Sequence, residues 1–406
     1  MEGEDNINWG VLPTPKIIQH REKLRPTYVP EVLVGRDHQY GKLVKAVLEL
    51  VEGITILPHM IYGSSGSGKT ATMKVLQKET HRRTNKNVVY VNARTLKTPV
   101  LIYTQLMKEL GLPTKIGLGI PTYLNNIAEY VTDNPTLFII DEIDGIIDSS
   151  GAKELYPFIR FNEIYPNVPG GNFGFMFATN NMDVQIAISS FTDYKGYLEE
   201  VRFDAYGVEE IYHILHQRVR EALIPKTFDE KVLHNLSEKI FYQHNSNLRH
   251  GLQIFALSCD EAEKKRRDSV SREDVLIAEE EHMLSELRKQ MYTEPIITLF
   301  VIRAITQSII EDGGIDRPDL YFLLNPKNKE SNYAIPEQYA TGSDTYLNRQ
   351  IYSVVRDLEK QFMVHLKQKN VYKTDKITWC SSSDPKEVLE LTKKIMEEKK
   401  LVTTHS

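Results

Sequence analysis

The sequence contains only two cysteines among its 406 residues, Cys259 and Cys380, and they lie far apart. So few cysteines exclude a disulfide scaffold and a cysteine-rich zinc site, and they fit a reducing compartment. We expect both to be packing residues. The longest apolar run, PIITLFVIRAI, is short and contains Arg303, so we expect no membrane-spanning segment. The acidic start MEGEDNINWG lacks an apolar stretch, which argues against a signal peptide.

An excess of positive charge is also absent, because the formal net charge is −5. Any surface that binds nucleic acid must therefore be a local patch. A hydrophobic content of 41% is ample for a packed core, and the length fits two or three domains.

Apolar strands alternate with helical patterns over the first half of the chain, which indicates a parallel α/β sheet. The five expected strands lie in ITILPHMIYG, VVYVNA, TLFIIDEID, FGFMFATNN and YLEEVRFDAY. Only helical patterns follow up to residue 285, and Ser271 and Asp274 stand at capping-box spacing before the last of them. We expect a solvated amino-terminal arm over 1–30, a nucleotide-binding base over 31–205, a helical lid over 206–285 and a further domain over 286–406.

A phosphate-binding loop is predicted by the stretch YGSSGSGKTA. Gly63, Gly68, Lys69 and Thr70 match the spacing G-x-x-x-x-G-K-S/T, between a predicted strand and a predicted helix. Glycines let successive N–H groups point at phosphate oxygens, and the helix adds the positive end of its dipole. Lys69 would reach the β- and γ-phosphates, and the Thr70 hydroxyl would bind Mg²⁺. The expected nucleotide-binding residues here are Gly63, Ser64, Ser65, Gly66, Ser67, Gly68, Lys69, Thr70 and Ala71.

An acidic pair ends the third predicted strand, LFIIDEID. We expect Asp141 to hold Mg²⁺ and Glu142 to orient or deprotonate the attacking water, since phosphoryl transfer depends on positioning and charge neutralisation. Asp144 is expected to be a loop or helix-capping carboxylate. Asn180 ends the fourth strand, where an amide could contact the γ-phosphate, although asparagine also ends strands as a turn residue.

Several motifs occur in an order that resembles the archaeal AAA+ initiators of replication, of the origin-recognition and cell-division-control type. They are VLVGRDHQYGKL, YGSSGSGKT, LFIIDEID, FATNN and SNLRHGL, followed by a carboxyl-terminal unit. The resemblance spans about residues 30–380, and its first motifs are shared by all AAA+ proteins. It implies a P-loop parallel sheet with a helical lid and a winged-helix domain, binding of ATP or ADP with Mg²⁺, and an ATP switch with slow hydrolysis.

The resemblance also assigns residues that the patterns alone leave open. Val34, Gly35 and Arg36 match the stretch that lines the adenine pocket, and Arg249 in SNLRHGL matches the sensor 2 arginine of the lid. GLPTKIGLGIPTYLNNI stands where the family has a DNA-contacting insertion, with Lys115 and Gly117 near its tip; a plain surface loop would look similar.

One departure from the family concerns the arginine finger that completes a neighbouring site in many AAA+ proteins. SSFTDYKGYLEEVRFDAY has no arginine at the expected position, and Lys195 and Arg202 are the nearby cations. This departure fits a protein that binds ATP tightly and hydrolyses it slowly.

A winged helix is predicted near the carboxyl terminus. Ile351, Val354, Val355, Leu358 and Phe362 have helical spacing, and MVHLKQKNVYKTDKITWC follows as two strands around a polar turn. Residues 349–376 hold seven Lys/Arg and three Asp/Glu, a local balance of +4 in an acidic protein. A protein-binding winged helix with a solvated basic face would look the same, but the resemblance favours DNA. The expected DNA contacts are Arg349, Lys369, Lys373 and Lys376, with Lys115 and Gly117.

Together these features predict an ATP-dependent initiator that binds duplex origin DNA and helps to load the replicative helicase. We expect a cytoplasmic, nucleoid-associated protein that is a monomer in solution and can assemble on DNA, with no membrane partner. Two alternatives stay open: a clamp-loader-like or chaperone-like AAA+ ATPase, and an ATP-binding regulator of transcription or of a mobile element.

Overall fold

The computed structural model describes residues 14–84, 86–96, 98–115, 117–181, 188, 197–340, 342–360, 364–368, 375–379 and 384–401. Lys195, Lys369, Lys373 and Cys380 lie outside these residues. Two compact units divide the chain at 275/276. The first is the α/β unit with its lid, and the second is the carboxyl-terminal unit.

A five-stranded parallel sheet forms the centre of the first unit, with the strand order β2-β3-β4-β1-β5. The strands are β1 His59–Gly63, β2 Asn87–Asn92, β3 Thr136–Asp141, β4 Phe173–Thr179 and β5 Glu199–Phe203. The predicted parallel α/β sheet is therefore confirmed. The first strand is shorter than predicted: Pro58 has no N–H for the ladder, and Ile54 and Leu57 are exposed.

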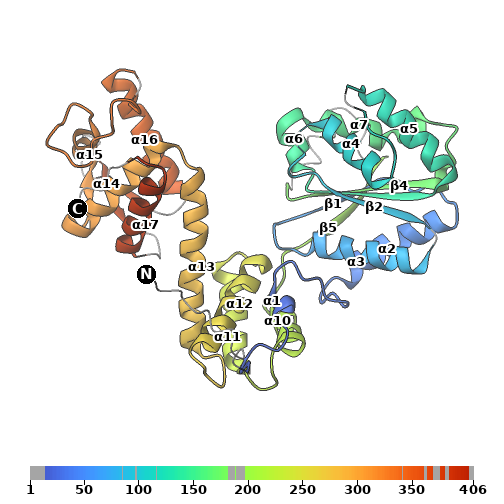
Figure 1. Ribbon diagram of the computed structural model, residues 1–406, viewed down its shortest axis with the longest axis horizontal. Helices are drawn as coiled ribbons and strands as arrows, with labels where there is room; N and C mark the ends of the chain where they lie inside the picture. Colours follow the sequence, from blue (N-terminus) through green and yellow to red (C-terminus); the bar gives the residue numbers. More distant parts are fainter. Residues whose placement is uncertain are drawn as a thin grey trace, which may run out of the picture. The chain divides into compact units, whose positions relative to one another are not determined.

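Helices cover both faces of this sheet, so its strands are apolar on both sides (Figure 1). The helices of the base are α2 Asp37–Val51, α3 Lys69–Arg83, α4 Pro99–Glu109, α5 Ile120–Asp133, α6 Asp144–Ser150, α7 Tyr156–Ile159 and α8 Phe161–Ile164. Phe138 and Ile140 of β3 pack in a core with α4 and α5, whereas Leu137 and Ile139 pack in a second core with α2 and α3.

The lid follows β5 and is helical, as predicted. Its helices are α10 Val208–Ala222, α11 Glu230–Gln243, α12 Leu248–Lys264 and the start of α13 Arg272–Thr293. The predicted capping box is present at α13: the Ser271 N–H donates to Asp274 Oδ2 at 2.9 Å, and the Asp274 N–H donates to Ser271 Oγ at 3.4 Å. Cys259 is fully buried in α12, as expected of a packing residue.

The amino-terminal segment from residue 14 packs against the lid, so the expectation of a solvated arm is wrong for this part. Ile17 and Ile18 are buried, and Leu24 of the short α1 (Arg21–Leu24) is buried as well. The carboxylate of Glu263 accepts from the N–H groups of Lys16, Ile17 and Ile18 at 2.9, 2.7 and 3.0 Å. The apolar side chains at positions 17, 18 and 24 thus hold the amino-terminal segment against the lid, although its composition predicts an irregular stretch.

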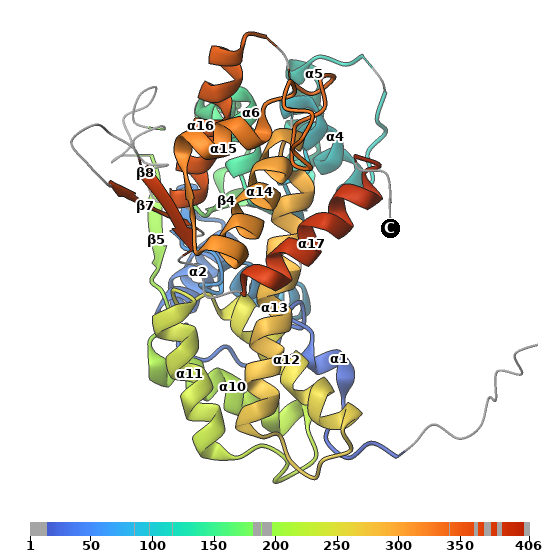
Figure 2. The same cartoon turned by 90° about the vertical axis from the view of Figure 1, so that its left-hand side faces the viewer.

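The carboxyl-terminal unit has the order of a winged helix, with a small sheet beside its helices (Figure 2). Its elements are α14 Ile296–Asp312, β6 Ile315–Asp316, α15 Arg317–Leu324, α16 Asp344–Lys360, β7 Val364–Gln368, β8 Asp375–Trp379 and α17 Pro385–Glu398. The predicted helix and hairpin are α16 and the antiparallel pair β7–β8. Leu347, Ile351, Val355 and Leu358 of α16 face the core.

Candidate nucleotide-binding site

The predicted nucleotide residues meet at the carboxyl ends of three neighbouring strands, β1, β3 and β4. Ligands of open α/β sheets bind at this edge. A cavity of about 630 Å³ opens there, lined by the loop after β1, the ends of β3 and β4, residues from the stretch 26–34, and α10 and α12 of the lid.

The loop after β1 folds around the ammonium group of Lys69. Lys69 Nζ donates to the carbonyl oxygens of Gly63 at 2.8 Å and Ser64 at 2.9 Å, and to Asn180 Oδ1 at 2.9 Å. Gly66 has a φ of 80°, and a Cβ there would lie 2.8 Å from the Leu248 N of the lid. Glycine is thus required both by the backbone conformation and by the close approach of the lid.

Lys69 is a buried cation surrounded by carboxylates. Burial lowers the pKa of Lys69 to about 8, although Asp141, Asp144 and Glu142 favour its charged form. The positive charge of Arg249 in the lid also lowers the pKa of Lys69, so this charge lies near the Lys69 ammonium group. A phosphate would give both cations the counter-charge that they need.

Thr70 and Asp141 lie where a hard cation could bind. The Thr70 hydroxyl donates to Asp141 Oδ2 at 2.7 Å, and the Tyr90 hydroxyl of β2 donates to the same oxygen at 2.6 Å. Asp141 is 1% exposed, and this burial raises its pKa, although the two hydrogen bonds act to lower it. One hydroxyl and one carboxylate fit Mg²⁺, which takes few protein ligands and keeps water and phosphate oxygens as the others.

Glu142 follows directly in an uncommon backbone conformation, with a φ of 54°. Asn92, at the end of β2, donates from Nδ2 to Glu142 Oε2 at 3.1 Å, and Arg94 Nη1 lies 3.5 Å from Glu142 Oε1. Non-glycine residues with positive φ gather at functional sites. The carboxylate therefore stands beside the cavity, held by two side chains from the neighbouring strand end.

Asp144 positions Asn180. Its carboxylate accepts from the Thr179 hydroxyl at 2.6 Å, from the Asn180 N–H at 3.0 Å and from the Asn181 N–H at 3.2 Å. It therefore closes the end of β4, and Asn180 in turn accepts from Lys69. This agrees with the expected loop or capping carboxylate and adds a contact to the site.

The lid contributes Arg249, which lies in the first turn of α12 and lines the cavity. Val34 lines the same cavity. Gly35 has a φ of 67°, next to Glu210. Arg36 is 3% exposed and bridges elements: its Nε donates to the Ser67 carbonyl at 2.9 Å and its Nη2 to the Asp204 carbonyl at 2.8 Å. Arg36 thus supports the phosphate loop from behind, outside the cavity lining.

Comparisons with known proteins agree with this geometry. A family model described as AAA domain matches residues 58–172, and one described as Cdc6 AAA+ ATPase-type lid domain matches residues 212–280. An ORC1-type DNA replication protein 1 of Sulfurisphaera tokodaii is 28% identical over 306 residues, which cover 74% of this chain and 76% of that protein. An ORC1-type DNA replication protein of Pyrococcus furiosus is 24% identical over 397 residues, which cover 90% of this chain and 88% of the relative.

The chain is a distant homologue of the archaeal ORC1/Cdc6-type AAA+ replication initiators. Its fold matches the structure of the Aeropyrum pernix ORC1 protein in complex with DNA, with a TM-score of 0.75 and 20% identity, over 96% of this chain and 100% of that one. The α/β base, the lid and the winged-helix unit thus have the fold of that structure.

The predicted DNA-contacting residues of this initiator homologue lie on two separate elements. Arg349 is exposed in the second turn of α16, and Lys376 is half-buried in β8. Lys115 and Gly117 are exposed between α4 and α5. Arg202, one of the two finger candidates, donates from Nε to Asp204 Oδ1 at 2.6 Å.

Sequence reasoning missed several residues of the nucleotide site. Tyr90 and Asn92 belong to β2, Arg94 follows this strand, and residues 26–30 and 33 come from the amino-terminal segment. Asn92 could have been found, because it is a polar residue at the end of a predicted strand and pairs in register with Asp141. The contribution of residues 26–30 and 33 carries no such signal, since it depends on packing against the lid.

Proposed function

We propose that this protein is an ATP-dependent initiator of DNA replication that binds duplex origin DNA and helps to load the replicative helicase. The observation that carries the proposal is the cavity of about 630 Å³, which is lined by both base and lid, in a chain that also has a winged-helix unit. The names of the relatives support replication, and the DNA in the Aeropyrum pernix structure supports a DNA ligand.

ATP or ADP is the proposed ligand of the cavity. The phosphates would lie against the backbone from Ser64 to Thr70 and against Lys69, at the positive end of α3. Thr70 and Asp141 would hold Mg²⁺, which when bound neutralises phosphate charge.

Hydrolysis is proposed to depend on Glu142, Asn180 and Arg249. Glu142 would orient the attacking water, Asn180 would contact the γ-phosphate beside Lys69, and Arg249 would bring positive charge from the lid. Because Arg249 belongs to the lid and Lys69 to the base, the γ-phosphate would favour a closed lid. ATP thus acts as a conformational switch, and turnover is expected to be slow and independent of protein concentration.

Duplex DNA is the proposed ligand of the winged-helix unit. Helix-turn-helix proteins place the start of one helix against base edges, and exposed Arg349 lies near the start of α16. Lys376, together with Lys369 and Lys373 in the segment between β7 and β8, would contact phosphates. Lys115 and Gly117 would add a second contact from the base. Association with the nucleoid follows from this activity.

Footprinting of the purified full chain on DNA upstream of its own gene, with ATP and with ADP, tests the proposal. We expect a protected site whose extent or affinity depends on the nucleotide. Lys69→Ala should remove that dependence, and Lys45→Ala, at an exposed lysine of α2, serves as its control.

Two other outcomes would point away from an initiator. ATP binding without affinity for random or upstream duplex would favour a clamp-loader-like or chaperone-like ATPase. Protection confined to promoters, unchanged by nucleotide, would favour a regulator that uses ATP as a structural ligand.

A further inference from the structure

Arg36 joins the phosphate loop after β1 to the start of the lid. It is 3% exposed, and its Nε donates to the Ser67 carbonyl oxygen at 2.9 Å. Its Nη2 donates at 2.8 Å to the Asp204 carbonyl oxygen, in the connection between β5 and α10. The guanidinium carbon lies 3.6 Å from the centre of the Tyr206 ring, and Nη1 lies 4.0 Å from Glu210 Oε1 in the first turn of α10. One side chain thus contacts the loop, the connection and the lid.

Tyr206, in the same connection, packs against both Arg36 and the phosphate loop. Its side chain is 4% exposed, and a Cβ at Gly68 would lie 2.3 Å from its hydroxyl oxygen and 3.5 Å from Arg36 Nε. Closely packed side chains of this kind transmit small displacements, because the interior has little free volume to absorb them. A movement of the loop at Gly68 would therefore displace Tyr206 and Arg36 as well.

The hydrogen bonds of Arg36 resist separation of the phosphate loop from the lid. A buried guanidinium that loses an acceptor is left with an unpaired donor, which is costly. Its planar fork also fixes the positions of its acceptors relative to one another. Glu210 extends this link into α10, because its Oε2 accepts from the Gly207 N–H at 2.8 Å, at the start of the helix. The backbone of Ser67 and the first turn of α10 are thus tied through one rigid group.

We propose that Arg36 is a positioning residue that couples the phosphate loop to the lid. This inference rests on the proposed ATP switch and names the side chain through which it would act. ATP would offer a γ-phosphate to both Lys69 of the base and Arg249 of the lid, whereas ADP would occupy the loop without that phosphate. Arg36 would hold the lid at the angle at which Arg249 reaches the γ-phosphate, so its loss should weaken ATP more than ADP.

A double-mutant cycle tests the inference through the ratio of ATP affinity to ADP affinity, measured by calorimetry on the full chain with Mg²⁺. Arg36→Lys keeps the charge, but one ammonium group cannot replace the fork that bonds two carbonyl oxygens. We expect it to lower the ratio about fivefold or more. Arg249→Ala should lower the ratio as well. In the Arg249→Ala background, Arg36→Lys should lower it no further, because both residues act through the same γ-phosphate contact.

Two further variants of the first unit support the cycle. Tyr206→Leu removes the ring that packs on Arg36 and should lower the ratio in the same way. It carries the test if circular dichroism shows that Arg36→Lys does not fold. Arg220→Lys, at an exposed arginine of α10, is the matched control and should leave the ratio unchanged.

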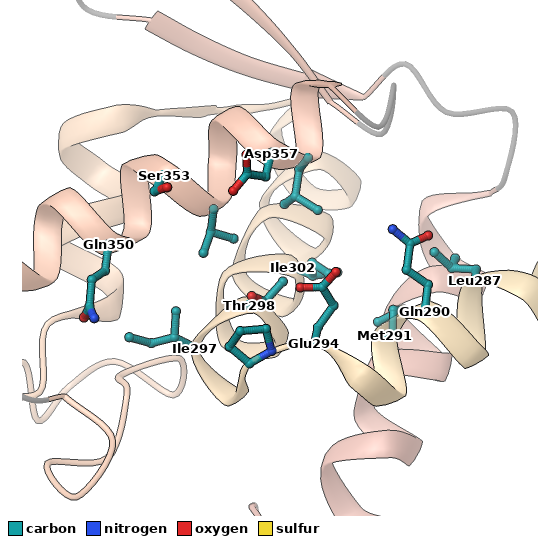
Figure 3. A pocket seen from close by; sticks show the side chains of 13 residues that line it. Leu287, Gln290, Met291, Glu294, Ile297, Thr298, Ile302, Gln350, Ser353 and Asp357 are labelled. Atoms are coloured by element: carbon teal, nitrogen blue, oxygen red, sulfur yellow. The ribbon is translucent and has the colours of Figure 1, made fainter. Parts of the chain in front are cut away.

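The carboxyl-terminal unit provides a control for loss of stability. Met291 is buried beside a separate cavity of about 290 Å³, between the end of α13, the start of α14 and α16 (Figure 3). Met291→Ala should lower Tm, because it removes a buried apolar side chain. It should leave the ratio unchanged, since none of the described residues that line that cavity also lines the nucleotide cavity.

Three results would overturn the inference. They are an unchanged ratio in both Arg36→Lys and Tyr206→Leu, an equal loss of ATP and ADP affinity in Arg36→Lys, and a fall in the ratio that is as large in the Arg249→Ala background as in the parent. The last result would place the effect in the phosphate loop itself. Equal affinities of the parent for ATP and ADP, unchanged by Arg249→Ala, would overturn the ATP switch on which the inference rests, so the two failures are distinguishable.

Discussion

Replacing Asp144 with alanine should uncouple the binding of ATP from its hydrolysis. The carboxylate accepts three hydrogen bonds, from the Thr179 hydroxyl and from the N–H groups of Asn180 and Asn181, at 2.6, 3.0 and 3.2 Å. These bonds fix Asn180, whose Oδ1 accepts a hydrogen bond from Lys69 Nζ. The phosphate contacts of the loop after β1 do not involve Asp144, so ATP should still bind.

The cost in stability follows from the same contacts. A hydrogen bond to a charged group contributes about 1.5–3 kcal/mol, but Asp144 is half-buried and water can reach part of the exposed donors. We therefore expect the free energy of unfolding to fall by about 3 kcal/mol, and Tm of the first unit to fall by about 6–12 °C. Single-turnover hydrolysis should fall by about a hundredfold, the effect expected when a reacting group is displaced by about 1 Å.

Calorimetry, ATP titration and single-turnover hydrolysis check these values together. Asp148→Ala is the control, because Asp148 is an exposed carboxylate of the same helix. An Asp144→Ala variant that matches the control in both Tm and turnover would refute the role of Asp144 in holding Asn180. A complete loss of ATP binding in a folded variant would show that Asp144 supports the loop after β1 instead.

Five further substitutions test other parts of the molecule. Lys69→Ala should abolish tight ATP binding in calorimetry and leave the circular dichroism spectrum unchanged. In the parent protein without metal, the affinity for ATP should fall about tenfold per pH unit above about pH 8, because Lys69 loses its proton there. Glu142→Gln should retain ATP and release phosphate more slowly, because an amide cannot accept the proton; equal release would exclude that role. Arg349→Ala should cost about 1–3 kcal/mol at one position of a specific site and little on random duplex, whereas Lys376→Ala should reduce the salt slope by about 1 in anisotropy titrations. Glu263→Gln should lower the free energy of unfolding by about 2 kcal/mol at neutral pH. Burial opposes ionisation of Glu263, but the three backbone donors lower its pKa below 4.5, so this difference should vanish as pH falls through the folded-state value.

The parts of the site that are contiguous in the chain could be predicted from the sequence. Lys69 and Thr70 follow a strand within one motif, and Asp141 and Glu142 end another apolar strand, so local spacing alone places them at one edge of a parallel sheet. The same holds for α16, because its apolar periodicity shows which face is buried, and for the β7–β8 hairpin, which was predicted as two strands around a polar turn. The resemblance to the initiators added Arg249, whose pattern in the chain is that of an ordinary surface arginine.

The tertiary structure decided which side chains from distant parts of the chain meet. Tyr90 reaches Asp141 because β2 and β3 are hydrogen-bonded neighbours, an order that no local pattern encodes. Residues 26–30, 33 and 34 border the cavity because the segment before them is fixed beside the lid, where Ile17 and Leu24 are buried and Glu263 binds the backbone. Periodicity specifies the buried face of each element, whereas the partner of that face depends on how all elements fill a common core, and this is a property of the folded chain as a whole.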